Sequence, residues 1–169
     1  DIVITVYHGD SYAKVRIANY HTNIVLVEKD GEVLESTVVE GEKEEGLTDR
    51  SLLNVKDIVD FADSVDVEEI KEVLDRQIKY NTAISAEGLR GDYGANIGSV
   101  LLETYGDDIR TRAKAAAAAG SDARMNGCEL PVIINSGSGN QGMTASLPVI
   151  EYAKELKVTD EKLYRALAL

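Results

Sequence analysis

Two features that could do chemistry lie close together in residues 121–149 of this 169-residue sequence. Cys128 is the only cysteine of the chain, and shortly after it residues 136–142 read Ser-Gly-Ser-Gly-Asn-Gln-Gly. Glycines let backbone N–H groups converge on one point, and a helix that starts after them adds partial positive charge. Such a segment suits a small anion, either a phosphate or a carboxylate. A plain flexible connection has the same composition, so that alternative stays open.

The glycine-rich segment matches neither common phosphate-binding motif. No Lys-Ser or Lys-Thr pair follows it, as a Walker loop requires, and it lacks the strand context and the later acidic residue of a dinucleotide-binding loop. Its hydroxyl and amide side chains add hydrogen-bonding groups to the backbone N–H groups. The candidates for binding a small anion, and for substrate binding in an enzyme, are Ser136, Gly137, Ser138, Gly139, Asn140, Gln141 and Gly142.

Cys128 is the candidate metal ligand, but it cannot act alone. Zinc and iron–sulfur sites take three or four ligands, and the two histidines, His8 and His21, do not complete such a set at any convincing spacing. If Cys128 binds a metal, its partner ligands lie outside this chain; otherwise it is a small buried hydrophobe, the common fate of a free cysteine. His21 lies between two expected strands and is the candidate catalytic imidazole, although a turn role remains open.

The elements that must position these residues fall into two lobes. Residues 1–40 alternate apolar and polar side chains, and Asp30-Gly31 is a strong signal for a tight hairpin turn, so we expect a small antiparallel sheet of three to four strands with one polar face. From residue 47 the apolar period becomes helical. The sequence thus predicts an α+β fold, with a small antiparallel β lobe and linker at 1–46 and a mainly helical lobe at 47–169.

Several helix boundaries can be predicted within the second lobe. Asp66 resembles the start of a capping box, and Thr159 is a plausible N-cap. Residues 107–125 are expected to be helical, as are residues 144–156 with Pro148 inside. Glycines at 88, 91, 94 and 98 are expected to interrupt the helices between them.

The composition excludes some classes of partner. Thirty acidic against eighteen basic residues give a net charge of −12, which disfavours nucleic acid and anionic membrane surfaces. No apolar run reaches the ~20 residues that span a bilayer. A single cysteine permits no internal disulfide, which fits a reducing compartment, so a cytoplasmic location is expected.

The segment SDARMNGCELPVIINSGSGNQGMTASLPV, with HTNIV upstream, resembles the L-cysteine desulfidase family, which is related to the iron–sulfur L-serine dehydratases. The similarity covers all 169 residues. Because the chains of that family are much longer, we expect this sequence to be an internal fragment, in agreement with its abrupt start at Asp1 and its helical end.

The resemblance implies an amino-acid β-eliminating lyase that uses a [4Fe-4S] cluster and no pyridoxal phosphate. L-cysteine would give sulfide, ammonia and pyruvate, and L-serine would give ammonia and pyruvate. Cys128 matches one cluster ligand by its Gly-Cys-Glu-Leu-Pro context, while the other ligands would lie outside this chain, so no cluster is expected in this fragment alone. The glycine-rich segment would anchor the substrate carboxylate.

The residue roles that this implies leave several points open. His21 is a weak candidate for the general base, and Asp122 and Lys or Tyr side chains stay open as alternatives. Asp122 and Arg124 can instead pair with each other or hold the glycine-rich segment. The expected partner is a small amino acid, L-cysteine or L-serine, with no nucleic acid and no membrane; a homodimer remains an open alternative.

Two other functions compete with the lyase. A non-catalytic binding module would use the same segment to hold a small anion or amino acid. A purely structural assembly domain would need neither Cys128 nor Asn140, so replacing them would leave every activity of the parent protein intact.

Overall fold

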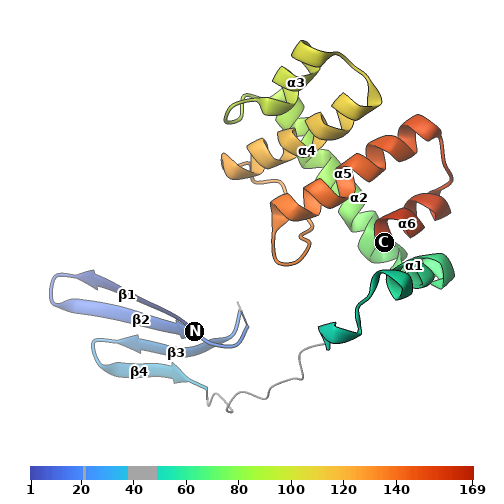
Figure 1. Ribbon diagram of the computed structural model, residues 1–169. Helices are drawn as coiled ribbons and strands as arrows, with labels where there is room; N and C mark the ends of the chain where they lie inside the picture. The colour runs from blue at the N-terminus through green and yellow to red at the C-terminus, as the bar shows by residue number, and fades with distance from the viewer. Residues whose placement is uncertain (21, 38–48) are drawn as a thin grey trace. The chain divides into compact units, whose positions relative to one another are not determined.

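The computed structural model describes residues 1–20, 22–37 and 49–169 (Figure 1). They form two units, Asp1–Leu52 and Leu53–Leu169. The first contains a four-stranded antiparallel sheet and the second is helical, which confirms the predicted α+β class. The predicted lobe boundary, between residues 46 and 47, lies outside the described residues and stays a prediction.

The sheet is a meander in which each strand pairs with its neighbour along the sequence. Its strands, in spatial as well as sequence order, are β1 (Ile2–His8), β2 (Ser11–Ile17), β3 (Ile24–Lys29) and β4 (Glu32–Ser36). The predicted hairpin turn joins β3 to β4. Asp30 and Gly31 have φ angles of 50° and 86°, the positive values that a tight primed turn requires.

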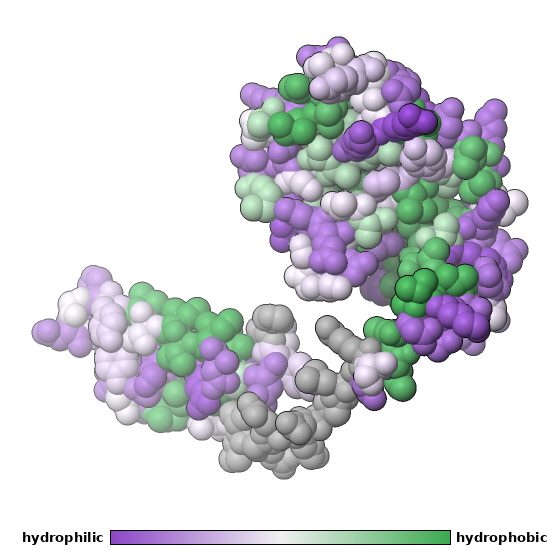
Figure 2. Space-filling model, in the orientation of Figure 1, coloured by the Kyte–Doolittle hydropathy of each residue, from purple (hydrophilic) through white to green (hydrophobic). Residues whose placement is uncertain are grey.

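The two faces of the sheet differ because side chains alternate along each strand. Cross-strand register places eight aliphatic side chains on one face: Ile2, Ile4, Val6, Ala13, Val15, Ile17, Ile24 and Val27. The opposite face carries the Lys14–Glu28 ion pair, at 3.4 Å between Nζ and Oε2. Only Ala18 and Val25 are fully buried among the described apolar side chains of this unit, and Figure 2 shows apolar surface exposed on it.

The helical unit is built around α2 and α4. Its elements are α1 (Val55–Ser64), α2 (Val67–Arg90), α3 (Ile97–Tyr105), α4 (Ile109–Met125), α5 (Gly139–Leu156) and α6 (Asp160–Ala168), and a short 3-10 turn, η1 (Arg50–Leu52), ends the first unit. Helix α4 packs against α2, α3 and α5. No helix among the described residues is long and apolar enough to cross a lipid bilayer.

Two of the four glycines expected to interrupt helices lie inside them instead. Gly88 belongs to α2 and Gly98 to α3, and only Gly91 and Gly94 fall in the break between these helices. The reason is close approach: a Cβ on Gly88 would lie 2.0 Å from the carbonyl oxygen of Ala119 on α4. The missing side chain of Gly88 lets the backbones of α2 and α4 approach closely. The residues around Gly88 in the sequence do not indicate this contact.

The helix ends follow the sequence more closely. Asp66 caps α2 by accepting from the N–H of Glu68, and Thr159 caps α6 by accepting from the N–H of Lys162. The core of the unit is aliphatic, as the composition requires, and its fully buried cluster contains Ile84, Ala116, Ala123, Met143, Leu147 and Ile150. This core lies directly beneath the start of α5, where the candidate site is found.

Candidate functional site

The glycine-rich segment is a tight turn followed at once by helix. Asn135 and Ser138 exchange backbone hydrogen bonds of 3.1 and 3.0 Å, and between them Ser136 and Gly137 have φ angles of 49° and 79°. Ser138 is the N-cap of α5, with its hydroxyl oxygen accepting from the N–H of Gln141 at 3.3 Å. We call residues 135–142, the turn plus the first turn of α5, the cradle.

The start of α5 corrects the predicted boundary. The helix begins at Gly139, so four of the seven candidate binding residues are helical rather than part of a loop. The expected start near Thr144 is wrong because the glycines serve close contacts. A Cβ on Gly142 would lie 2.1 Å from the carbonyl oxygen of Ile133, and one on Gly139 would lie 2.5 Å from Nε of Arg124.

A cation lies against the positive end of α5. Nη1 of Arg124 donates to Oδ1 of Asn140 at 3.1 Å, so the guanidinium holds the first helical turn. Asp122 acts elsewhere, because its carboxylate accepts from the N–H of Ile97, at 2.7 Å, at the start of α3. Asp122 and Arg124 were expected either to pair with each other or to hold the glycine-rich segment. Arg124 holds that segment, whereas Asp122 caps the start of α3.

Cys128 owes its position to the end of α4. Its N–H donates to the carbonyl of Ala123 at 3.0 Å, and the N–H of Gly127, with φ of 85°, donates to the carbonyl of Arg124 at 3.3 Å. These two bonds form a Schellman motif, which fixes the residue after the glycine against the last helical turn. Cys128 is half-buried and packs against the edge of the core cluster together with Val132.

Tyr93 and Glu87 form a polar pair beside this thiol that sequence reasoning missed. The Tyr93 hydroxyl donates to Oε1 of Glu87 at 3.0 Å, and Arg90 pairs with the other carboxylate oxygen. The hydrogen bond to Glu87, followed by the contact with Cys128, raises the pKa of Tyr93 to about 12. Arg90 first, and Tyr93 second, hold the pKa of Glu87 below its ordinary value. The sequence does not indicate that this pair lies beside Cys128, because that contact joins residues that are distant along the chain.

The part of the chain that the structure describes does not complete a metal site. Among residues 1–20, 22–37 and 49–169, no group of three His, Cys, Asp or Glu side chains could hold a metal ion. Cys128 is the single thiol, whereas an iron–sulfur cluster takes several thiolates. The chain can offer one ligand and does not by itself fit a cluster. His21, the candidate base, lies outside the described residues.

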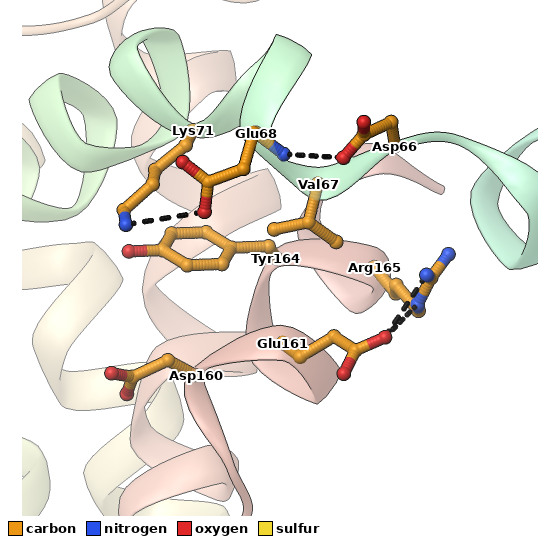
Figure 3. A pocket seen from close by; sticks show the side chains of 8 residues that line it. All are labelled: Asp66, Val67, Glu68, Lys71, Asp160, Glu161, Tyr164 and Arg165. Carbon is orange, nitrogen blue, oxygen red and sulfur yellow. Dashed lines mark hydrogen bonds and ion pairs between the residues drawn. The ribbon is translucent and has the colours of Figure 1, made fainter.

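An open pocket of about 400 Å³ lies elsewhere, between the start of α2 and α6 (Figure 3). Several of its charged side chains already have partners within the protein. Lys71 pairs with Glu68 at 3.4 Å and Arg165 pairs with Glu161 at 3.0 Å. The Tyr164 hydroxyl donates to Asp75, a contact that raises the pKa of Tyr164 to about 12. Cys128 and the cradle contribute nothing to its lining, so this pocket is separate from the candidate site.

Comparison with known proteins places the chain among relatives that are longer than it is. A family model described as serine dehydratase alpha chain matches residues 18–169. The chain is 64% identical to a UPF0597 protein of Desulfitobacterium hafniense, covering 100% of this chain and 39% of that protein. It is 55% identical to a UPF0597 protein of Lachnoclostridium phytofermentans, covering 99% of this chain and 40% of that one. It is 46% identical to a UPF0597 protein of Fusobacterium nucleatum, covering 98% of this chain and 40% of that protein.

The chain therefore spans about two fifths of the length of these curated relatives. No solved structure matches it.

Proposed function

The chain belongs to the serine dehydratase alpha-chain family, and on that premise we propose that it is the part of an amino-acid β-eliminating lyase that anchors the substrate carboxylate. The substrate is L-cysteine, which gives sulfide, ammonia and pyruvate, or L-serine, which gives ammonia and pyruvate. In this proposal Cys128 is one ligand of a [4Fe-4S] cluster completed by thiolates from outside this chain.

The observation that carries the proposal is the positive end of α5 beside the Arg124 guanidinium. An α-helix leaves its first N–H groups without intrahelical acceptors, here those of Gly139 and Asn140. Together with Arg124, these groups favour a negative charge at the cradle. A carboxylate is such a charge, and it stays unreacted throughout a β-elimination, so it is the part of the substrate that a rigid site can hold.

The reaction sets clear requirements for the remaining groups. A base removes the α-proton, the bond from Cβ to sulfur or oxygen breaks, and the resulting enamine tautomerises to an imine. Water then releases ammonia and leaves pyruvate. His21 remains our proposed base. Holding the carboxylate at the cradle orients the Cα–H bond toward one side of the substrate, which is what a single base requires.

The test uses the full-length protein, reconstituted anaerobically with iron and sulfide. We expect the broad visible absorbance of an iron–sulfur cluster, and pyruvate from L-cysteine or L-serine. Arg124→Gln should raise KM by about tenfold, because it removes a charged contact at the cradle. Arg110→Gln, on the exposed start of the same helix, removes the same charge away from the cradle and should leave KM unchanged.

Two results would contradict the proposal. A reconstituted protein that forms no cluster and releases no pyruvate from either amino acid is not this lyase. If it binds either amino acid without turnover, the non-catalytic binding module is the better description. Cys128→Ala should prevent cluster formation; an intact cluster in that variant would remove Cys128 from the ligand set.

A further inference from the structure

A buried asparagine on α2 holds the chain segment that leads into the cradle. Asn81 is completely buried. Its Oδ1 accepts from the N–H of Ile133 at 2.9 Å, and its Nδ2 donates to the carbonyl of Ile133 at 3.3 Å and to Oγ of Ser146 at 3.0 Å. One side chain thus satisfies both backbone groups of Ile133, as a neighbouring strand would.

The segment needs this support because it belongs to no sheet. Residues 131–134 are assigned to neither helix nor strand, and the nearest bridge is the isolated one between Asn135 and Ser138 that follows them. A half-buried backbone without partners would be costly, so the amide of Asn81 replaces the missing strand. Ile133 is held two residues before the turn of the cradle begins.

The segment also contacts α5. The carbonyl of Ile133 approaches Gly142 so closely that a Cβ there would lie 2.1 Å away. Ser146, one turn further along α5, accepts from Asn81 and donates to the carbonyl of Gly142 at 2.8 Å. Asn81, Ile133 and Ser146 therefore link α2, residues 131–134 and the first two turns of α5. These links fix the turn of the cradle relative to the helix that follows it.

We propose that Asn81 is a positioning residue for the cradle: it sets where the turn lies relative to the start of α5, and so whether the N–H groups there converge on one anion. This inference rests on the proposed function for its effect on the substrate. Its structural part, that Asn81 holds the cradle, stands without it. Asn81 itself does not contact the substrate.

Ser85 provides a matched control. It lies one turn after Asn81 on the same helix, is also buried, and donates to the carbonyl of Ala116 at 2.8 Å. Ser85→Ala removes one buried side-chain hydrogen bond from α2 and Asn81→Ala removes three, and only Asn81 contacts the segment before the cradle. A merely structural role for Asn81 predicts that neither variant accelerates exchange selectively in the segment before the cradle.

The experiment compares hydrogen–deuterium exchange in the full-length protein and its variants, read on peptides that cover residues 132–142. We expect exchange there to be about tenfold faster in Asn81→Ala and unchanged in Ser85→Ala. In the enzyme assay, Asn81→Ala should raise KM about tenfold while kcat changes by less than about threefold. Ser85→Ala should leave KM unchanged.

The outcomes separate this inference from the function on which it rests. Unchanged exchange in Asn81→Ala, or equal acceleration in Ser85→Ala, overturns the positioning role whether or not the protein is a lyase. Faster exchange confined to Asn81→Ala supports it even if neither amino acid is turned over. If Asn81→Ala does not fold, Ser146→Ala decides, because it removes one of the three bonds of Asn81 and should accelerate exchange in the same peptides to a smaller extent.

Discussion

In the helical unit Ile84 is completely buried, whereas in the sheet unit Ile4 leaves 52% of its surface exposed. The difference is general: helix backbones meet through Gly88, Gly98 and alanines, while the sheet is a single layer with an aliphatic face. Identical side chains therefore contribute very different amounts to stability in the two units. Every strand of the sheet pairs with a neighbour in sequence, whereas the helical unit depends on contacts between distant residues.

The sharpest test of this contrast is one substitution made in each unit. Ile84→Ala should lower the free energy of unfolding of the helical unit by about 4 kcal/mol, because it leaves a cavity in a close-packed core. Ile4→Ala should cost the sheet less than about 1 kcal/mol, because half of the side chain already faces solvent. Urea unfolding of each variant, followed by circular dichroism, measures both. An equal cost at Ile4 would mean that the aliphatic face is covered in solution, and the contrast would fail.

Gly88→Ala should have the next largest effect, about 3 kcal/mol on the helical unit, because a new Cβ meets the backbone of Ala119 and the helices must separate. Ala86→Ser is the control on the exposed side of α2 and should change stability by less than about 0.5 kcal/mol. The same urea titration compares them. A neutral Gly88→Ala would show that α2 and α4 are not in close contact.

The smallest effect is expected in the sheet, at the turn between β3 and β4. The N–H of Tyr12 and the hydroxyl of Ser11 donate to Asp30 and hold the pKa of its carboxyl below the ordinary value. The resulting stabilisation is present above that ordinary value and is lost as pH falls through the lowered pKa. Asp30→Asn keeps a good turn residue but removes this titration, so the acid unfolding of the sheet should become less steep.

The measurement for Asp30→Asn is hydrogen–deuterium exchange during acid titration, read on peptides from residues 1–37 for the sheet and from residues 53–169 for the helical unit. The helical unit provides an internal reference. There the backbone N–H of Thr111 first, then the Thr111 hydroxyl and the N–H of Arg110, lower the pKa of the Asp108 carboxyl. The pH at which the helical unit unfolds should be the same with and without Asp30→Asn. A change in both units would mean that they unfold together rather than separately.

Much of the fold could be predicted from short patterns. The hairpin at Asp30-Gly31 and the N-caps at Asp66 and Thr159 follow from the local preferences of those residue types and are confirmed. Among the described hydrogen bonds, Asp66 caps through the N–H of Glu68, and the reciprocal bond of a capping box is not present. The start of α5 could not be predicted in this way. Glycine at 139 and 142 is what a loop prefers, and only the distant carbonyl of Ile133 and side chain of Arg124 explain why it is helical.

The candidate site shows the same limit. The cradle could be located because its residue types are unusual, and its Arg124 partner was among the residues considered. Asn81 and Tyr93 could not be found, because their roles depend on atoms brought from elsewhere in the chain: Ile133 and Ser146 for Asn81, and Cys128 for Tyr93. A buried asparagine on a helix has no sequence pattern that distinguishes it from an exposed one.

The order in which partners follow one another along the chain bears on biosynthesis. Every strand of the sheet pairs with the strand next to it in sequence, so this unit can form on the ribosome once β4 has emerged. Asn81, by contrast, is made long before Ile133 and Ser146 and has no acceptor until they appear. Until that moment the amide of Asn81 can be satisfied only by water, so this part of the helical unit reaches its final packing late.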